Sequence, residues 1–390
     1  MSRDFDLLDG GWYASQPYAD WAWMREHAPA YWDAKNEVWA LTRYHDVLAV
    51  EKDAVTYSSH RAPRPHGDHL PMMISMDAPE HSNRRKLVSR GFTPRRVREH
   101  EATVRRICTD IVDRVAPKGS CDFVWDIAAP LPLLLIADML GFPPESYDDL
   151  LRWSDDLIRA TTVDPPVEVA TAGLEAMLAF REFQLGVIAS RRADPQDDLV
   201  TILCHAEIDG ERLDDESIVQ ESLLILIGGD ETSRHVMTDG MLALLAHPHQ
   251  MQILRDDPSA IEVGVEELLR WVSPIKNMSR TVTREVELHG QTLHEGDQLI
   301  LMYPSANRDD AVFDDPDVFD VRRDPNPHLA FGFGPHFCMG ASLARLELQV
   351  MFGELLRRLP DLHLAGDPLP RRESNFISGP EAMPVRFTPA

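Results

Sequence analysis

The sequence predicts a mostly helical protein with small peripheral β-sheets. Apolar residues recur at helical spacing along most of the chain, strand-like runs are short, and the 29 prolines are scattered between the helical segments. The chain contains no internal repeat, no low-complexity tract and no Gly/Ser linker. We therefore expect residues 1–390 to form a single domain.

The elements follow from the spacing of apolar residues. A helix places positions three and four apart on one face, and six segments show this pattern: 96–116, 145–161, 172–192, 215–246, 259–272 and 341–359. Short runs bounded by turn residues indicate strands at 37–43, 281–303 and 375–388.

The longest segment runs from Asp214 to Ala246 and ends before Pro248. As one helix of about 33 residues it would be roughly 50 Å long and would cross the whole molecule. Its apolar middle is followed by Gly228 and Gly229, which each disfavour a helix interior by about 1 kcal/mol. Two shorter helices that meet at a glycine turn are the alternative.

The charge of the chain limits its partners. The formal net charge of −25 disfavours nucleic acid or an anionic membrane surface as a global partner, because long-range repulsion opposes both. The segment 84–106 differs, with nine Lys/Arg residues against Glu99 and Glu101. Either this segment docks an acidic partner or it is a solvated helix face.

The sequence predicts a cytoplasmic protein. Its four cysteines lie far apart without CxxC or zinc spacing, which fits a reducing compartment. The acidic N-terminus lacks the apolar run of a signal peptide. The longest apolar stretch, 130–142, is interrupted by Pro132 and Asp138 and is too short to span a bilayer.

The residues most indicative of chemistry surround Cys338, within 328–348 (HLAFGFGPHFCMGASLARLEL). Gly332, Gly334 and Pro335 predict an irregular backbone before the cysteine. The glycines also let a flat, bulky group approach the backbone closely. A structural cysteine in an ordinary helix would need none of them.

An amphipathic helix is predicted to start near Gly340, directly after Cys338. The unpaired N–H groups and positive dipole at its start favour thiolate over thiol. A thiolate held this way suits a soft or redox metal. A zinc ion would need three more ligands, and only His336 is near in sequence.

The segment FGFGPHFCMG resembles the haem-binding loop of the cytochrome P450 family. Three further matches occur in the family's order: His81 with Arg85, GGDET at 228–232, and Glu267 with Arg270. The resemblance extends from about residue 5 to the end of the chain. It implies the family's fold, an α-rich prism with small peripheral sheets, and haem b as the cofactor.

The resemblance implies roles for these residues. Cys338 would be the axial iron ligand, whose electron donation favours O–O cleavage. Glu267 and Arg270 would form a buried structural pair that supports the haem loop. The propionates of the haem would be held by His81, Arg85, Arg280 and His336.

Thr232 and Glu231 would then lie on the distal side of the haem and deliver protons during oxygen activation. Gly228 would border the haem and open the helix for oxygen and water. Two departures from the family pattern are Gly228, where alanine is more usual, and Asp230 before the usual acid. Position favours Glu231 as the proton carrier.

Several stretches resemble the actinobacterial sterol side-chain oxidases, which hydroxylate the terminal methyl (C26/C27) of cholesterol or cholest-4-en-3-one. These stretches are 70–81, 151–162, 224–235, 272–280 and 375–389. Apolar residues in or next to them would line a sterol pocket, although such residues are more often core: Met72, Met73, Leu226, Ile227, Ile275, Met278 and Ile377.

The chain has no flavin or NAD fingerprint, so electrons must come from a separate donor. The resemblance implies a ferredoxin with its reductase, docking near the basic segment 84–106, and molecular oxygen as co-substrate. Three alternatives stay open: the same chemistry on another lipophile (fatty acid, terpene or polyketide), a haem-thiolate enzyme that uses peroxide, and a non-catalytic haem sensor.

Overall fold

The computed structural model describes residues 3–161, 165–208, 210–366 and 369–390. Thr162, the last residue of the stretch 151–162, lies outside them. The α-helices are α1 (Gly10–Ala14), α2 (Tyr18–His27), α3 (Tyr44–Lys52), α4 (Glu80–Val88), α5 (Pro94–Glu99), α6 (Glu101–Val115), α7 (Pro130–Leu140), α8 (Tyr147–Arg159), α9 (Val167–Ala193), α10 (Leu199–His205), α11 (Asp215–Ala246), α12 (Pro248–Asp256), α13 (Ile261–Val272), α14 (Tyr303–Ala306) and α15 (Ala341–Arg358).

The segment 215–246 forms one continuous helix, α11, so the alternative of two helices meeting at a glycine turn is wrong. The Asp214 carboxylate caps its start by accepting from the Ser217 backbone N–H at 2.7 Å. A Cβ at Gly229 would lie 2.2 Å from Ile136 of α7, so α7 packs directly on the helix backbone there. Tertiary packing therefore outweighs the low helix propensity of the glycines.

The other predicted helices are present with shifted ends. The segment 96–116 is divided at His100 into α5 and α6, and α5 begins with Pro94 after the capping side chain of Thr93. The predicted helices at 145–161, 172–192, 259–272 and 341–359 correspond to α8, α9, α13 and α15.

The apolar stretch at 130–142 contributes α7, a helix that the periodicity did not predict because it is apolar on all sides. A π-helical turn, Phe123–Ala128, precedes it. In the described part of the chain, the 18 residues Phe123–Leu140 are the one helical segment long and apolar enough to cross a membrane. Within the structure, 72% of this segment is buried, as in a core helix.

The main sheet has five strands in the order β1-β2-β10-β7-β3. Strand β10 pairs in parallel with β2 and antiparallel with β7. The segment 375–388 contains only one strand, β12, because most of it is irregular. The strands are β1 (Ala30–Asp33), β2 (Val38–Leu41), β3 (Tyr57–Ser58), β4 (Ser120–Asp122), β5 (Glu207–Ile208), β6 (Glu211–Arg212), β7 (Asn277–Val282), β8 (Val286–Leu288), β9 (Gln291–Leu293), β10 (Gln298–Met302), β11 (His363–Leu364) and β12 (Pro384–Arg386).

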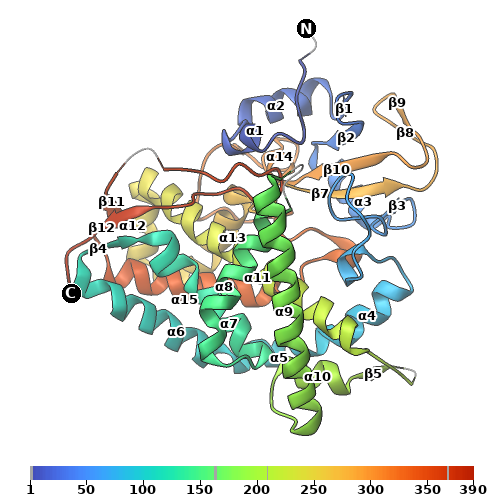
Figure 1. The fold of residues 1–390 in the computed structure, drawn as a ribbon. Coiled ribbons are helices and arrows are strands. Elements are labelled where there is room, and N and C mark those ends of the chain that lie inside the picture. The colour runs from blue at the N-terminus through green and yellow to red at the C-terminus, as the bar shows by residue number, and fades with distance from the viewer. Residues whose placement is uncertain (1–2, 162–164, 209, 367–368) are drawn as a thin grey trace.

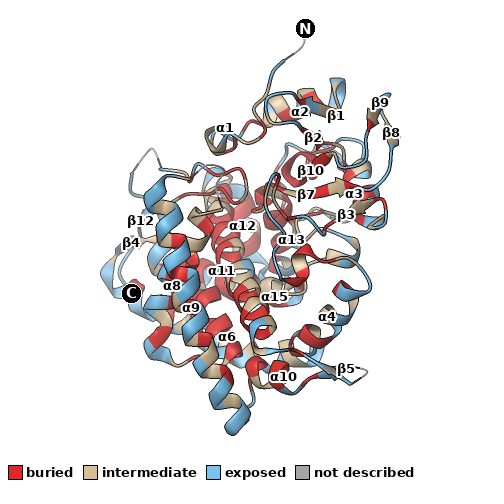
Figure 2. Ribbon diagram, turned by 45° about the vertical axis from the view of Figure 1, so that its right-hand side comes forward, coloured by how far each residue is buried: buried red, intermediate tan, exposed pale blue. Residues whose placement is uncertain are grey.

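Figure 1 shows the five-stranded sheet beside the N-terminal helices, and the larger helical part of the molecule next to it, with α11 surrounded by other helices. Buried residues concentrate on α11, α13 and α15 in the centre (Figure 2). Ser233 of α11 lies next to Glu347 of α15. The loop before α15, which carries Cys338, therefore comes near the middle of α11.

Candidate active site

The loop around Cys338 folds as its glycines predict. Gly332 and Gly334 have φ angles of 65° and 69°, in the left-handed region that favours glycine. A Cβ at Gly334 would lie 2.2 Å from the carbonyl oxygen of Glu51, so no side chain fits there. The Cys338 N–H donates to the Phe331 carbonyl at 2.9 Å, and α15 begins three residues after the cysteine.

Two opposing effects act on the Cys338 thiol. Burial raises its pKa, and this is the largest effect. Backbone N–H groups of Gly340 and Ala341 at the start of α15, with the guanidiniums of Arg85 and Arg345, lower it. The start of the helix thus favours the thiolate as predicted, but a bound metal cation is needed to outweigh the desolvation of the sulfur.

Four predicted propionate-binding residues converge beside this loop. The rings of His81 and His336 lie 4.1 Å apart between centroids. Burial and the nearby guanidiniums of Arg280 and Arg85 lower the pKa of His336 to about 3, so this imidazole is neutral. Burial likewise lowers the pKa of His81.

This cluster fits an anionic group. Arg280 has one carboxylate partner, Glu51, at 3.3 Å, whereas Arg85 has no carboxylate within 4 Å in the described part of the chain. His81 Nε2 is buried without a hydrogen-bond partner among the described residues. Two guanidiniums and an unpaired ring nitrogen beside one carboxylate suit the two propionates of a haem.

The middle of α11 is open at the position that the sequence predicts to border the haem. Gly228 is exposed although its helix runs through the centre of the structure, and no atom lies within 4 Å of where its Cβ would be. The Thr232 hydroxyl donates to the Gly228 carbonyl at 2.8 Å. The glycine therefore provides space for a flat group, next to a hydroxyl.

Glu231 is fully buried in a cluster of basic side chains. It contacts the Arg234 guanidinium, lies 3.3 Å from His235 Nε2, and accepts from Arg372 Nη1 at 3.0 Å. Burial lowers the pKa of His235 well below its ordinary value, so this imidazole is neutral. The arginines compensate the buried carboxylate.

A chain of charged groups connects Glu231 to the surface. Arg372 also donates to Asp155 of α8 at 2.5 Å, and Asp155 accepts from Arg159 at 2.6 Å. The Arg159 side chain is 40% exposed. Sequence reasoning missed Arg372 and Asp155 because they lie far from Glu231 in the chain and match no motif.

Asp230 occupies a different environment from Glu231. Its carboxyl group is fully buried near Ser154 and Arg234, and burial raises its pKa. The charged chain to the surface begins at Glu231. The role of Glu231 as the proton carrier stays a prediction.

Glu347 is a further acid near the site that sequence reasoning missed. It is buried on α15 beside Ser233, the residue that follows Thr232, and burial raises its pKa to about 8. Its position in an ordinary amphipathic helix carries no local signal. The group is therefore protonated at neutral pH.

Glu347→Gln is expected to change the pH dependence of stability. Between the ordinary pKa of 4.5 and about 8, the unfolded state releases a proton that the folded state keeps. Wild-type stability therefore falls as pH rises through this window, by up to about 5 kcal/mol for this group. Urea unfolding at pH 5 should show similar stability for both proteins, and at pH 8 the variant should be more stable. A constant difference across this range would contradict the assignment.

Glu267 and Arg270 form the buried pair that the sequence predicts. Both side chains are fully buried, and two guanidinium nitrogens donate to the two carboxylate oxygens at 2.8 Å each. Arg323, which the motif did not include, lies 3.2 Å from the same carboxylate. Asn326 also donates to it at 3.1 Å. The pair thus anchors the segment that leads to the Cys338 loop.

The seven apolar residues predicted to line a pocket belong to different parts of the core. Met72, Met73, Leu226 and Ile227 lie in one hydrophobic cluster. Ile275 and Met278 lie in another, beside the five-stranded sheet. An isolated β-bridge brings Ile377 next to Ile275. Their role around a substrate stays a prediction.

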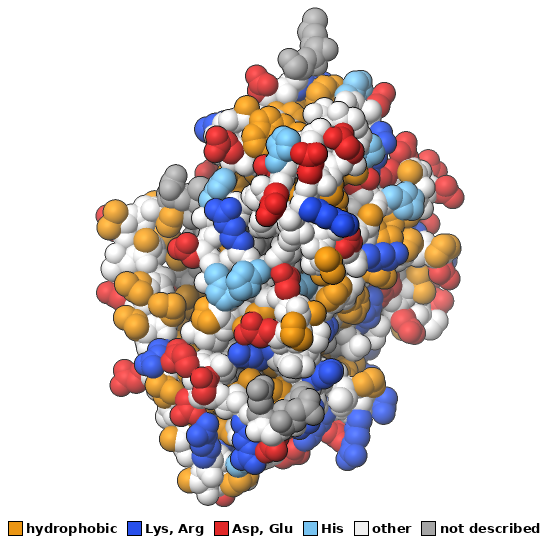
Figure 3. All heavy atoms as spheres, turned by 90° about the vertical axis from the view of Figure 1, so that its right-hand side faces the viewer, with side chains coloured by type: hydrophobic (Ala, Val, Ile, Leu, Met, Phe, Trp, Pro, Cys, Tyr) orange, Lys and Arg blue, Asp and Glu red, His pale blue; other side chains and the backbone are white. Residues whose placement is uncertain are grey.

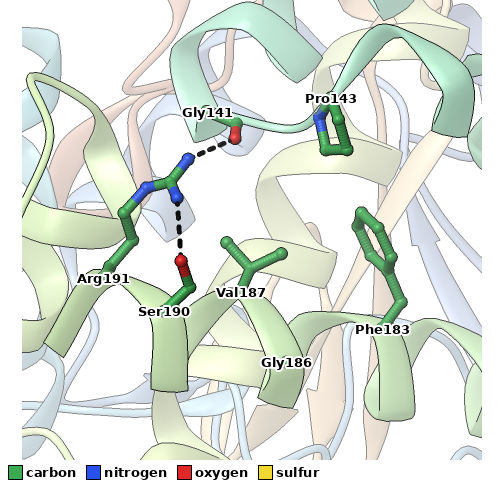
Figure 4. A pocket seen from close by; sticks show the side chains of 7 residues that line it. All are labelled: Gly141, Pro143, Phe183, Gly186, Val187, Ser190 and Arg191. Atoms are coloured by element: carbon green, nitrogen blue, oxygen red, sulfur yellow. Dashed lines mark hydrogen bonds between the residues drawn. The ribbon is translucent and has the colours of Figure 1, made fainter. Parts of the chain in front are cut away.

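A separate cavity of about 560 Å³ lies between the end of α7 and α9. Figure 4 shows Phe183, Val187 and Pro143 along it, with Arg191 donating to the Gly141 carbonyl and to Ser190. None of the predicted site residues lines this cavity. It is distinct from the site around Cys338.

The basic segment 84–106 is partly neutralised by neighbouring acids. Arg95 and Arg96 both pair with Glu99, and Arg96 also pairs with Asp197 at 2.7 Å. Basic side chains nevertheless gather with interspersed acids on the lower part of the face that carries α4 (Figure 3). The local excess of positive charge is smaller than the sequence alone suggests.

Comparisons with known proteins found a family model and similar chains. The family model described as Cytochrome P450 matches residues 175–381. Steroid C26-monooxygenase from Mycobacterium tuberculosis is 48% identical and covers 99% of this chain and 98% of its own length. Steroid C26-monooxygenase from Mycolicibacterium smegmatis is 47% identical, with 99% and 97% covered. The crystal structure of CYP109E1 from Bacillus megaterium in complex with testosterone is similar with a TM-score of 0.87 at 31% identity, covering 95% of this chain and 99% of that chain.

Proposed function

The chain belongs to the cytochrome P450 family, and from this we propose that it is a haem-thiolate monooxygenase that hydroxylates the terminal side-chain methyl (C26/C27) of a sterol. The substrate would be cholesterol or cholest-4-en-3-one. The reaction would take place in the cytoplasm and would be a step of sterol catabolism. The observation that carries the sterol assignment is the identity of 47–48% over nearly the full length to steroid C26-monooxygenases from two genera.

The proposed reaction assigns a task to each part of the site. A bound haem with a thiolate ligand would supply the chemistry that inserts an oxygen atom from molecular oxygen into a C–H bond. Cys338 would hold the iron. Arg85 and Arg280 would bind the propionates through charge-assisted hydrogen bonds, with His81 and His336 as further hydrogen-bonding partners. The residues therefore fit a haem, and we propose haem b.

Protons would reach the distal side through this chain's own groups. Glu231 would pass a proton to the Thr232 hydroxyl, whose contact with the Gly228 carbonyl holds it toward the open part of α11. The ion pairs of Arg372, Asp155 and Arg159 run from Glu231 toward the surface and would hold its carboxylate in place. Water would carry the protons to Glu231, because a guanidinium does not release its own. The predicted apolar pocket would exclude water around the sterol tail.

The first test is a titration of the purified haem protein with cholest-4-en-3-one, followed by its visible spectrum. We expect a saturable low-spin to high-spin change as the sterol displaces water. A long-chain fatty acid, a terpene and a polyketide serve as comparison ligands. A thiolate-haem spectrum without a response to sterol, but with a response to one of these, would replace the sterol by that lipophile.

Thr232→Ala is expected to separate electron use from product formation. Haem and sterol should still bind, while most reducing equivalents should appear as peroxide because the hydroxyl that delivers protons is missing. The ratio of product to NADH consumed, measured with a ferredoxin and its reductase, checks this. Thr238→Ala, on the same helix, is the control, and full coupling in Thr232→Ala would mean that protons arrive by another route.

We further propose that an acidic ferredoxin docks near the basic segment 84–106. Reversal of Arg95 and Arg96 to glutamate should slow the first electron transfer, because it removes two positive charges and frees Glu99 and Asp197. Stopped-flow reduction at several salt concentrations should show a rate about tenfold lower than that of the wild type at low salt. The difference between the two rates should become smaller at high salt. Arg152→Glu in α8 is the control. Equal rates in all proteins would exclude this docking surface.

A further inference from the structure

We propose that Glu51 is a positioning residue for the haem. Its carboxylate shares the Arg280 guanidinium with a haem propionate, and this sets the reduction potential of the iron. Glu51 lies at the end of α3, and nothing in its local sequence marks it. This inference rests on the haem-binding part of the proposed function and is independent of the substrate.

The carboxylate of Glu51 is placed between two groups of the candidate site. Its Oε2 lies 3.3 Å from Arg280 Nη2, and its Oε1 accepts a hydrogen bond from the Tyr303 hydroxyl. The Glu51 side chain is 2% exposed and that of Arg280 is 8% exposed, so water screens this pair little. Burial and the adjacent carboxylate raise the pKa of Tyr303 well above its ordinary value, which keeps the phenol a donor.

Glu51 also contacts the loop that carries Cys338. The Gly334 backbone lies directly against the Glu51 carbonyl, and the position of a Cβ at Gly332 is 3.6 Å from the Glu51 carboxylate. The next residue, Lys52, has its ammonium 5.1 Å from the centre of the Phe333 ring. Both the backbone and the side chains at the end of α3 are thus packed against the Cys338 loop.

This arrangement has an electrostatic consequence. Arg280 is one of two guanidiniums in the cationic cluster, and Glu51 is its one carboxylate partner in the described part of the chain. A buried negative charge at this position opposes the arrival of an electron on the haem. Removal of that charge, with the shape retained, should favour the ferrous state.

Glu51→Gln tests this directly. We expect the substrate-free haem protein to shift its ferric–ferrous equilibrium about tenfold toward the ferrous state, which is about 59 mV for one electron. Dye-coupled reductive titration with dithionite measures the potential. Tyr303→Phe keeps the charge and loses only the hydroxyl donor, so its potential should stay at the wild-type value or become more negative.

The control for loss of one negative charge is Glu145→Gln, because Glu145 is exposed and far along the chain from the cluster. A Glu51→Gln potential equal to that of Glu145→Gln would overturn the proposal. If Glu51→Gln loses its haem on purification, Glu51→Asp is the second variant. Retention of haem in Glu51→Asp would support a role of the negative charge. Loss of haem in both variants would overturn the proposal, because the shape of the Glu51 side chain would then be what matters. A wild-type protein without a thiolate-haem spectrum would instead refute the proposed function.

Discussion

Cys338→Ser is expected to abolish the thiolate-type spectrum of the carbon monoxide complex and to lower turnover by at least about a thousandfold, or about 4 kcal/mol in the barrier. Serine keeps the size and the backbone contacts of the loop. Its hydroxyl is a much weaker electron donor to iron than a thiolate, and electron donation favours O–O cleavage. The variant should therefore fold and bind haem while losing the chemistry.

Spectra of the ferrous protein with carbon monoxide and rates of sterol oxidation check this expectation. Cys108→Ser and Cys204→Ser are the controls, because both cysteines are free and buried and neither is predicted to bind the iron. The spectra of these two variants should match the wild type. Survival of the thiolate spectrum in Cys338→Ser would place the iron ligand elsewhere.

Glu267→Gln is expected to lower the free energy of unfolding by about 3–5 kcal/mol, because it leaves the fully buried Arg270 and the partly buried Arg323 without their carboxylate partner. A loss of this size is a large part of the total stability of a typical domain. The segment that leads to the Cys338 loop should loosen with it. Urea unfolding and the fraction of haem retained measure the two effects.

The matched control is Glu354→Gln, since Glu354 and Arg357 have the same i,i+3 spacing on α15. The Arg357 side chain is 67% exposed, and an exposed ion pair contributes less than about 1 kcal/mol to the free energy of unfolding. The comparison separates burial from spacing. Similar losses in both variants would show that burial of the Glu267 pair has no special importance.

Several features were predictable because their causes are local. The ends of α11 follow from the Asp214 cap and Pro248, and the Cys338 loop follows from glycines that must adopt positive φ. The spacing of Glu267 and Arg270 brings them to one helix face. The motifs around these residues also led to the family.

Other features were decided only by the tertiary structure. The two adjacent glycines in α11 were compatible with a break between two helices. The packing of Ile136 against Gly229 stabilises a single continuous helix instead. The neutralisation of Arg96 by Asp197 was likewise invisible in a count of charges along the segment.

The same holds for the partners of the site residues. The sequence by itself predicted which residues carry the chemistry, since Cys338 and Glu231 stand in motifs set by local spacing and Arg280 ends a stretch that resembles the sterol oxidases. Only the fold determined that Arg372 joins Glu231 and that Glu51 joins Arg280, across 141 and 229 residues of chain. Such pairs leave no periodic signal, because their contact depends on how separate elements pack and on the desolvation that the packing imposes.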